Sequence, residues 1–242
     1  MRGKWYCWGV TSAIIVAAGK SSRMGGQTDK LFLPVAGRPL VAHTWQRFDS
    51  AGCIAEIVLV VRDGRQKAFA ELAAACGFQK PFRLVAGGVE RQDSVWNGLL
   101  HLAAGTEIVA IQDAARPCTS EALIEAKIAA AREVGAAVAA QAISDTINQS
   151  EDGRFIARHL DRSRLWAVQT PQTFRVEVIR RALAQVRERK LLVTDDTAAC
   201  ELIGQAVQLV CRPEPNPKVT RPEDVAGVER LLMDLQQGFP VA

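Results

Sequence analysis

Residues 13–24 read AIIVAAGKSSRM, and this stretch decides the fold. It begins with an apolar run of the β type, as in a parallel strand that is buried on both faces. The run ends at Gly19, which has no Cβ and lets the backbone turn and approach a ligand closely. A polar, cationic stretch follows, and Lys30 lies just beyond it. The pattern predicts a phosphate-binding loop, in which backbone N–H groups and the charges of Arg23 and Lys30 surround a polyphosphate.

Two familiar phosphate-binding motifs do not fit this loop. A Walker A loop needs a glycine five positions before Gly19, where this chain has Ile14. The dinucleotide-binding motif fails because Ser21 and Ser22 stand where further glycines are needed. The stretch therefore predicts a phosphate loop of another type, and an ordinary strand-to-helix turn with surface cations remains the alternative.

The composition indicates one large α/β domain or two small ones. The chain has 242 residues, of which 48% are hydrophobic, and this supports a substantial core. The net charge of +4 is too small to imply nucleic-acid binding and suits a cationic pocket for an anionic substrate. No apolar run is long enough to span a bilayer, no C-x-x-C pair occurs among the six cysteines, and the three histidines are scattered. We therefore expect a cytoplasmic protein with free thiols and no zinc site, which binds neither nucleic acid nor membrane.

Strands and helices alternate over the first two thirds of the sequence. Buried β-type runs are expected at 57–61, 83–86, 108–113 and 136–142, and helices at 40–51, 68–76 and 121–133. This alternation predicts βαβ units in a doubly wound, mostly parallel α/β sheet of the Rossmann-like type. The pair Gly87-Gly88 and the carboxylate of Asp113 follow such strands, as Gly19 does. A ligand is therefore expected where the carboxyl ends of these strands meet.

The pattern changes after the strand that ends at residue 142. Residues 143–169 predict a polar, hairpin-like excursion that protrudes as a β-arm. The later elements are expected to be a helix at 175–188, a helix that begins just after Thr194, a strand at 207–210 and a last helix that Pro222 opens. A simple N-cap is the alternative to a functional role for Thr194. We expect an N-terminal extension at 1–12 and a single domain at 13–242.

Asp113 is the candidate metal ligand. A carboxylate at a strand tip beside a phosphate loop suits Mg²⁺ or another divalent cation, which completes its shell with phosphate and water. A salt bridge between Asp113 and Arg116 is the alternative. No Ser, Cys or His is visibly paired with a base. This suits nucleotidyl transfer to a phosphate, in which catalysis rests on positioning and positive charge, with Arg23, Lys30, Arg116 and Lys218 as the candidate cations.

Four segments together resemble one family of nucleotidyltransferases. They are AAGKSSRM at 17–24, DK at 29–30, DAARP at 113–117 and KVTRPED at 218–224. In this order they resemble the 2-C-methyl-D-erythritol 4-phosphate cytidylyltransferases of the nonmevalonate isoprenoid pathway, and the resemblance extends from residue 13 to about residue 232. It implies Mg²⁺-dependent transfer of CMP from CTP to methylerythritol phosphate, with release of pyrophosphate. The acceptor phosphate would attack the α-phosphorus in line.

The resemblance also assigns roles to individual residues. The implied catalytic residues are Arg23, Lys30, Arg162 and Lys218. The implied CTP contacts are Ala17, Ala18, Gly19, Arg23, Lys30, Gly88, Ser94 and Asp113, with Asp113 also holding the metal. The implied acceptor contacts are Asp113, Arg116, Thr146, Arg162, Thr170, Thr194, Lys218 and Thr220. The arm would embrace a second subunit, so that a homodimer shares each site.

Two positions depart from the family pattern, and other classes stay open. Asp29 stands where a proline is frequent, and Val89 replaces an acidic residue of some members. Ribitol-5-phosphate cytidylyltransferase is the nearest rival because it has the same fold and chemistry, although the DAARP segment favours the methylerythritol enzyme. A regulatory nucleotide-binding protein would be expected to lack Arg23, Lys30 or Asp113, and the missing glycines disfavour a nicotinamide-dependent dehydrogenase.

Overall fold

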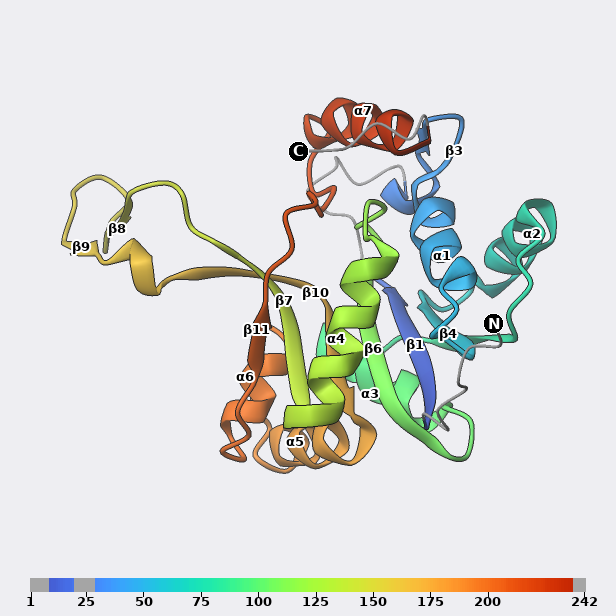
Figure 1. The fold of residues 1–242 in the computed structure, drawn as a ribbon, viewed down its shortest axis with the longest axis horizontal. Coiled ribbons are helices and arrows are strands. Elements are labelled where there is room, and N and C mark those ends of the chain that lie inside the picture. Colours follow the sequence, from blue (N-terminus) through green and yellow to red (C-terminus); the bar gives the residue numbers. More distant parts are fainter. Residues whose placement is uncertain (1–8, 20–28, 237–242) are drawn as a thin grey trace, which may run out of the picture.

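A seven-stranded sheet forms the centre of the computed structural model, which describes residues 9–19 and 29–236 (Figure 1). Its strand order is β11-β7-β10-β6-β1-β4-β5. The strands are β1 (Val10–Ala17), β4 (Glu56–Val61), β5 (Phe82–Ala86), β6 (Thr106–Asp113), β7 (Ala136–Ala142), β10 (Trp166–Arg175) and β11 (Gln208–Val210). A separate two-stranded ladder, β2 (Pro34–Val35) with β3 (Arg38–Pro39), follows the short helix η2 (Lys30–Phe32).

The sheet is mostly parallel, as the sequence predicted. Strand β1 pairs in parallel with β4 and β6, β4 with β5, and β7 with β11. Strand β10 is the exception, because it runs antiparallel between β6 and β7. The sequence prediction missed it and assigned its first residues, 166–169, to the arm. Its polar residues and Pro171 give no continuous apolar run, and its ladder with β7 is interrupted between Gln169 and Gln172.

Helices cover both faces of the sheet, as expected for a doubly wound fold. The helices are α1 (Leu40–Ser50), α2 (Gln66–Cys76), α3 (Arg91–Leu100), α4 (Glu121–Val134), α5 (Val176–Glu188), α6 (Asp196–Glu201) and α7 (Asp224–Gln236). One core cluster joins the sheet to α1, α2, α4 and α7, and the other joins it to α3, α5 and α6. Strand β1 serves both, with Ile15 in the first cluster and Ile14 in the second, because successive side chains point to opposite faces.

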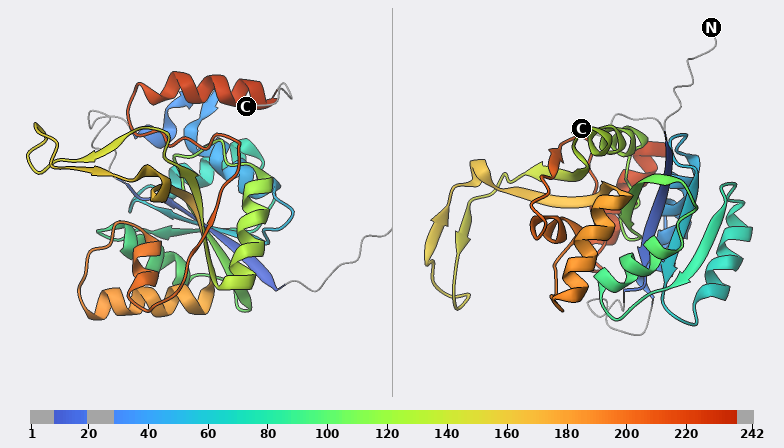
Figure 2. Two further views of the ribbon diagram at one scale, coloured as in Figure 1. Left: turned by 60° about the vertical axis from the view of Figure 1, so that its left-hand side comes forward. Right: turned by 90° about the horizontal axis from the view of Figure 1, so that it is seen from below.

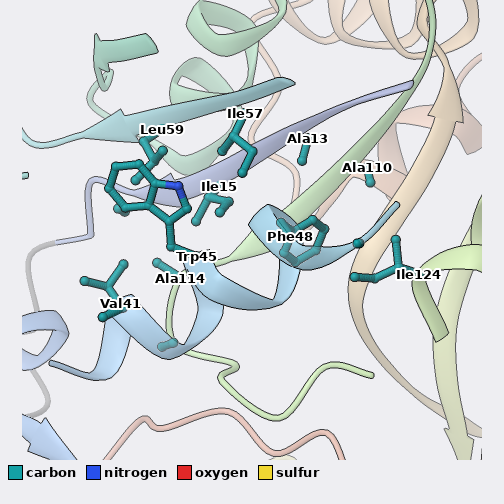
Figure 3. Packing of buried hydrophobic residues seen from close by; sticks show 14 of the residues in the cluster. Ala13, Ile15, Val41, Trp45, Phe48, Ile57, Leu59, Ala110, Ala114 and Ile124 are labelled. Carbon is teal, nitrogen blue, oxygen red and sulfur yellow. The ribbon is translucent and has the colours of Figure 1, made fainter. Parts of the chain in front are cut away.

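Helix α1 supplies the largest side chains of the first cluster. Trp45 and Phe48 are fully buried and face Ile15, Ile57 and Leu59 of the sheet (Figure 3). The large apolar contact between one helix and the neighbouring strands β1 and β4 fixes these strands relative to each other.

The ends of the helices follow the sequence signals with one error. Ser120 caps α4 by accepting a hydrogen bond from the N–H of Leu123, and Gly77 ends α2 in the left-handed conformation. The alternative role considered for Thr194, a simple N-cap of the next helix, is wrong. Asp195 is the N-cap of α6, since its Oδ1 accepts from the N–H of Ala198 at 3.0 Å, and a carboxylate is a strong acceptor at that position.

The predicted arm protrudes from the body of the molecule (Figures 1 and 2). It contains the antiparallel pair β8 (Ile147–Gln149) and β9 (Arg158–Leu160), followed by the short helix η3 (Arg162–Arg164). At its base, Ala142 of β7 pairs with Trp166 of β10. Among the helices of the described residues, none is both long enough and apolar enough to cross a membrane.

Lys127 of α4 is fully buried, and its Nζ donates to the carbonyl of Val210 at 2.5 Å. Burial lowers the pKa of this amine to about 7, because the charged form is poorly solvated. Between pH 7 and about 10.4 the unfolded chain therefore binds more protons than the folded chain, and the free energy of unfolding should rise with pH.

We expect Lys127→Met to increase the free energy of unfolding at pH 7, with the gain over wild type shrinking towards pH 9.5. Urea titrations at both values measure this difference. Lys67→Met on the exposed face of α2 is the control and should show no such pH-dependent gain. A Lys127→Met protein whose difference from wild type did not change with pH would contradict the prediction.

Candidate functional site

The carboxyl ends of four neighbouring strands open into one cavity of about 690 Å³. Residues from β1, β4, β5 and β6 or just beyond them line it, together with η2 and the loop before α7. Eight of the site residues that the resemblance implies lie in this lining: Ala17, Ala18, Gly19, Lys30, Gly88, Ser94, Asp113 and Lys218. The predicted convergence of the strand ends is therefore confirmed.

The end of β5 forms one wall of the cavity. At Gly87 and Gly88 in this wall, a side chain would clash with neighbouring atoms. A Cβ added at Gly87 would lie 2.4 Å from Cβ of Ala18, and one at Gly88 would lie 2.2 Å from Cβ of Asp93. The N–H of Gly88 donates to the hydroxyl of Ser94 at 3.1 Å, and that hydroxyl donates to the carbonyl of Glu90. This wall thus presents closely packed backbone to the cavity, which suits the recognition of a flat ring by main-chain groups.

Asp113 lies between two cations at the end of β6. Its Oδ2 accepts from Nζ of Lys218 at 2.6 Å, and its Oδ1 lies 3.4 Å from Nε of Arg91. Burial alone would raise the pKa of this carboxyl, but the charges of Arg91 and Lys218 outweigh it and lower the pKa to about 2. Asp113 is therefore ionised throughout the neutral range. The salt bridge with Arg116 considered as an alternative is wrong, because Arg116 donates to the carbonyl of Asn216 instead.

Arg91 and Asp196 belong to the site but escaped sequence reasoning. Nη1 of Arg91, at the start of α3, donates to Oδ2 of Asp196 at 2.7 Å, and Asp196 is fully buried. Burial raises the pKa of Asp196, and Arg91 opposes that effect. Arg91 thus joins a buried carboxylate of α6 to Asp113. One signal in the sequence could have identified Arg91, because this cation lies three residues after the glycine pair that ends a strand.

The loop that carries Lys218 is held by a buried polar network. Nη1 of Arg116 donates to the carbonyl of Asn216 at 2.6 Å, and Nδ2 of Asn216 donates to the carbonyl of Thr170 at 2.7 Å. The hydroxyl of Thr119 donates to Oδ1 of Asn216 at 3.0 Å. Because each of these bonds is buried, breaking one leaves an unsatisfied polar group, and the network fixes the backbone just before Lys218.

Lys30 reaches the same loop from the opposite side of the cavity. Its Nζ donates to the carbonyl of Val219 at 3.0 Å, and the N–H of Val219 donates to the carbonyl of Ala115 at 2.9 Å. Lys30, Lys218 and Arg91 thus line the same cavity as Asp113 and the strand-end glycines Gly19 and Gly88. Such a site concentrates positive charge where a polyphosphate can bind.

Comparison with known proteins decides the family. The family model for 2-C-methyl-D-erythritol 4-phosphate cytidylyltransferase matches residues 11–234. The chain belongs to the 2-C-methyl-D-erythritol 4-phosphate cytidylyltransferase family. It is 40% identical over 222 residues to the family enzyme of Pelotomaculum thermopropionicum, covering 91% of this chain and 93% of that one. The corresponding enzyme of Desulforamulus reducens is 41% identical over 221 residues, with 91% and 94% covered.

Solved structures of cytidylyltransferases have the same fold. The 4-diphosphocytidyl-2C-methyl-D-erythritol synthase of Anaerococcus prevotii superposes with a TM-score of 0.81 at 28% identity, covering 93% of this chain and 98% of that chain. The cytidylyltransferase of Thermus thermophilus superposes with a TM-score of 0.77 at 30% identity, covering 93% and 99%.

The remaining residues implied by the cytidylyltransferase resemblance lie outside the cavity lining. Arg116 and Thr170 are buried beside it, and the hydroxyl of Thr220 donates to Asp224 at 2.7 Å. Thr194 directly precedes the N-cap of α6. The exposed residues Thr146 and Arg162 belong to the arm, where Arg162 donates to the carbonyl of Ser144. Arg23 lies outside the described residues. The structure therefore brings together the residues that the resemblance implies for CTP, apart from Arg23, but not those of the arm.

Proposed function

We propose that this chain transfers CMP from CTP to 2-C-methyl-D-erythritol 4-phosphate, giving 4-diphosphocytidyl-2-C-methyl-D-erythritol and pyrophosphate. The observation that carries the proposal is the meeting of Lys30, Lys218 and Asp113 at a glycine-walled cavity. An oxygen of the acceptor phosphate attacks the α-phosphorus of CTP, and the bond from that phosphorus to the pyrophosphate oxygen breaks. A phosphomonoester is already anionic at neutral pH, so the reaction needs charge neutralisation and positioning rather than a base.

The nucleotide contacts follow from the cavity walls. Backbone groups of Ala17, Ala18 and Gly19 hold the triphosphate end, and the wall of Gly88 and Ser94 holds cytosine. A carbonyl in that wall accepts a hydrogen bond from the exocyclic amine of the base. Lys30 and Arg23 stabilise the charge that develops on the transferring phosphate.

Asp113 is the proposed ligand of Mg²⁺ or another divalent cation. The described residues contain no group of three His, Cys, Asp or Glu side chains that would form an all-protein site. A single ionised carboxylate at a phosphate-binding cavity fits Mg²⁺, which keeps several waters and shares phosphate oxygens with its substrate. When bound, the metal would supply Lewis-acid stabilisation of the phosphates, while Lys218 orients Asp113 and the acceptor phosphate.

A second copy of the chain is the proposed partner, and the arm is its binding element. The acceptor contacts proposed from the resemblance are Asp113, Arg116, Thr146, Arg162, Thr170, Thr194, Lys218 and Thr220. Thr146 and Arg162 are exposed on the arm, away from the cavity of their own subunit. In a homodimer the arm would bring them to the partner's cavity. Since CTP is a cytoplasmic metabolite, the reaction is expected in the cytoplasm.

A complementation experiment tests the shared site. Arg162→Ala and Lys218→Ala should each be inactive alone. Co-expressed, they should recover about one quarter of wild-type activity, since half of the symmetric dimers are mixed and one of their two sites is intact. Pyrophosphate release by the purified mixture measures this, with sedimentation as the check on dimer formation. No recovery in a verified mixed dimer would place both residues in one subunit's site.

The reaction itself is tested by pyrophosphate release with CTP, Mg²⁺ and two acceptors side by side. We expect release with methylerythritol 4-phosphate and little or none with ribitol 5-phosphate. Release of pyrophosphate with ribitol 5-phosphate alone would leave the proposed mechanism in place but would show that the proposed acceptor is wrong. Binding of CTP without turnover of either acceptor would favour a regulatory nucleotide-binding protein.

A further inference from the structure

The turn between β4 and α2 places two arginines beside the tip of β1. The N–H of Arg65 donates to the carbonyl of Arg62 at 3.0 Å and closes the turn at residues 62–65. Gly64 has a φ of 77°, which a residue with a Cβ adopts only with strain, and its N–H donates to Asp63. The local sequence Arg-Asp-Gly-Arg thus closes a tight turn that carries an arginine at each end.

Arg62 contacts the end of the segment that enters the predicted phosphate loop. Its Nη2 donates to the carbonyl of Gly19 at 2.7 Å. Both residues line the nucleotide cavity. The pairing of β1 with β4 sets Ala17, two residues before Gly19, opposite Val61, which directly precedes Arg62. A charge-assisted bond to this carbonyl fixes the orientation of the peptide at the loop entrance.

Arg65 contacts the other end of that loop. Its Nη2 lies 3.5 Å from Oδ2 of Asp29, whose side chain is 14% exposed, and its guanidinium lies over the ring of Phe32 at 4.9 Å. The Oδ1 of Asp29 also accepts from the N–H of Leu31 and so begins η2, the helix that contains Lys30. Phe32 in turn contacts Phe69 of α2 edge-on at 5.1 Å.

We propose that the turn at 62–65 is a clamp that positions both ends of the phosphate loop, Gly19 through Arg62 and Asp29 through Arg65. The proposal rests on the proposed function and assigns Arg62, Arg65 and Asp29 as positioning residues for CTP. With Gly19 and Lys30 held at a fixed separation, less conformational freedom is lost when the triphosphate binds. The clamp therefore acts on CTP affinity more than on the chemical step.

The test measures CTP binding by calorimetry and KM and kcat by pyrophosphate release. We expect Arg62→Ala to weaken CTP binding about tenfold and Arg65→Ala or Asp29→Asn about threefold, with a smaller change in kcat. Because Arg65 and Asp29 act as a pair, their double variant should be no weaker than either single variant. Gly64→Ala keeps both guanidinium groups but strains the turn, and it should also raise KM for CTP.

Arg83→Ala is the matched control. Arg83 of β5 forms an ion pair at 3.8 Å with Glu56 of β4, and it does not line the cavity. The Arg83→Ala variant should bind CTP as wild type does. Wild-type affinity for CTP in Arg62→Ala and Arg65→Ala, with unchanged thermal melting, would overturn the clamp alone. Failure of the wild-type protein to bind CTP would instead overturn the proposed function.

Discussion

Replacing Asp113 by asparagine is expected to lower kcat/KM for CMP transfer by about 10³-fold or more, while the protein remains folded. The carboxylate is the proposed metal ligand. Its negative charge is balanced by the positive charges of Lys218, at 2.6 Å, and Arg91, at 3.4 Å. The amide keeps the shape of the side chain but removes the charge. Lys218 then loses its carboxylate partner, Arg91 keeps only Asp196, and the metal loses its protein ligand. Pyrophosphate release across a range of Mg²⁺ concentrations measures the effect.

Two comparisons distinguish the loss of charge at Asp113 from a general effect of removing a carboxylate. Glu71→Gln removes a carboxylate from the exposed face of α2 and should retain wild-type activity. The pKa of Asp113 is about 2, so the acid limb of the wild-type pH–rate profile between pH 5 and 8 should not come from this residue. An Asp113→Asn enzyme within tenfold of wild type would remove Asp113 from the mechanism.

Replacing Lys30 by alanine is expected to lower kcat by about 10²- to 10³-fold, the usual effect of removing one preorganised group that stabilises transition-state charge. Lys30 lines the cavity and donates to the carbonyl of Val219, which places its ammonium group beside the loop of Lys218. CTP affinity should fall less than kcat, because the charge on the phosphates increases in the transition state. Single-turnover kinetics and calorimetry on the same preparation measure the two effects.

Lys67→Ala on α2 is the control for loss of one positive charge, since its side chain is 90% exposed. It should turn over as wild type does. Lys30→Arg should recover part of kcat, because the charge returns on a longer and planar group. If Lys30→Ala changed CTP affinity and kcat equally, Lys30 would be a binding residue and not a stabiliser of the transition state.

The sequence was sufficient to predict the parallel strands of the core and the meeting of their carboxyl ends. Runs such as 57–61 are apolar without interruption, so they predict buried parallel strands from local pattern alone. Because parallel strands deliver their carboxyl ends to one edge, Gly19, Gly88 and Asp113 could be placed together without coordinates. Lys218 was identified through the KVTRPED segment at 218–224. In the structure its Nζ donates to Oδ2 of Asp113 at 2.6 Å.

The features that were missed depend on contacts between distant parts of the chain. Strand β10 mixes polar residues with Pro171 and is a strand because β6 and β7 flank it. Arg91 and Asp196 are 105 residues apart, and no local pattern announces an ion pair at such a separation. Thr194 and Asp195 were both chemically suitable caps, and only the backbone geometry decided between them.

The reversed direction of β10 has a consequence for the architecture of the arm. Since β7 and β10 are antiparallel neighbours, the chain leaves the sheet at Ala142 and re-enters it at Trp166, directly opposite. The arm is therefore an insertion whose two ends already meet, and loops with adjacent ends tolerate large changes of length. Its length can change between relatives, or be rebuilt by design, without disturbing the sheet that holds the cavity, as long as Thr146 and Arg162 are kept. The fold thereby carries the cavity on the sheet and the residues proposed for the acceptor, Thr146 and Arg162, on an insertion that can change separately from that sheet.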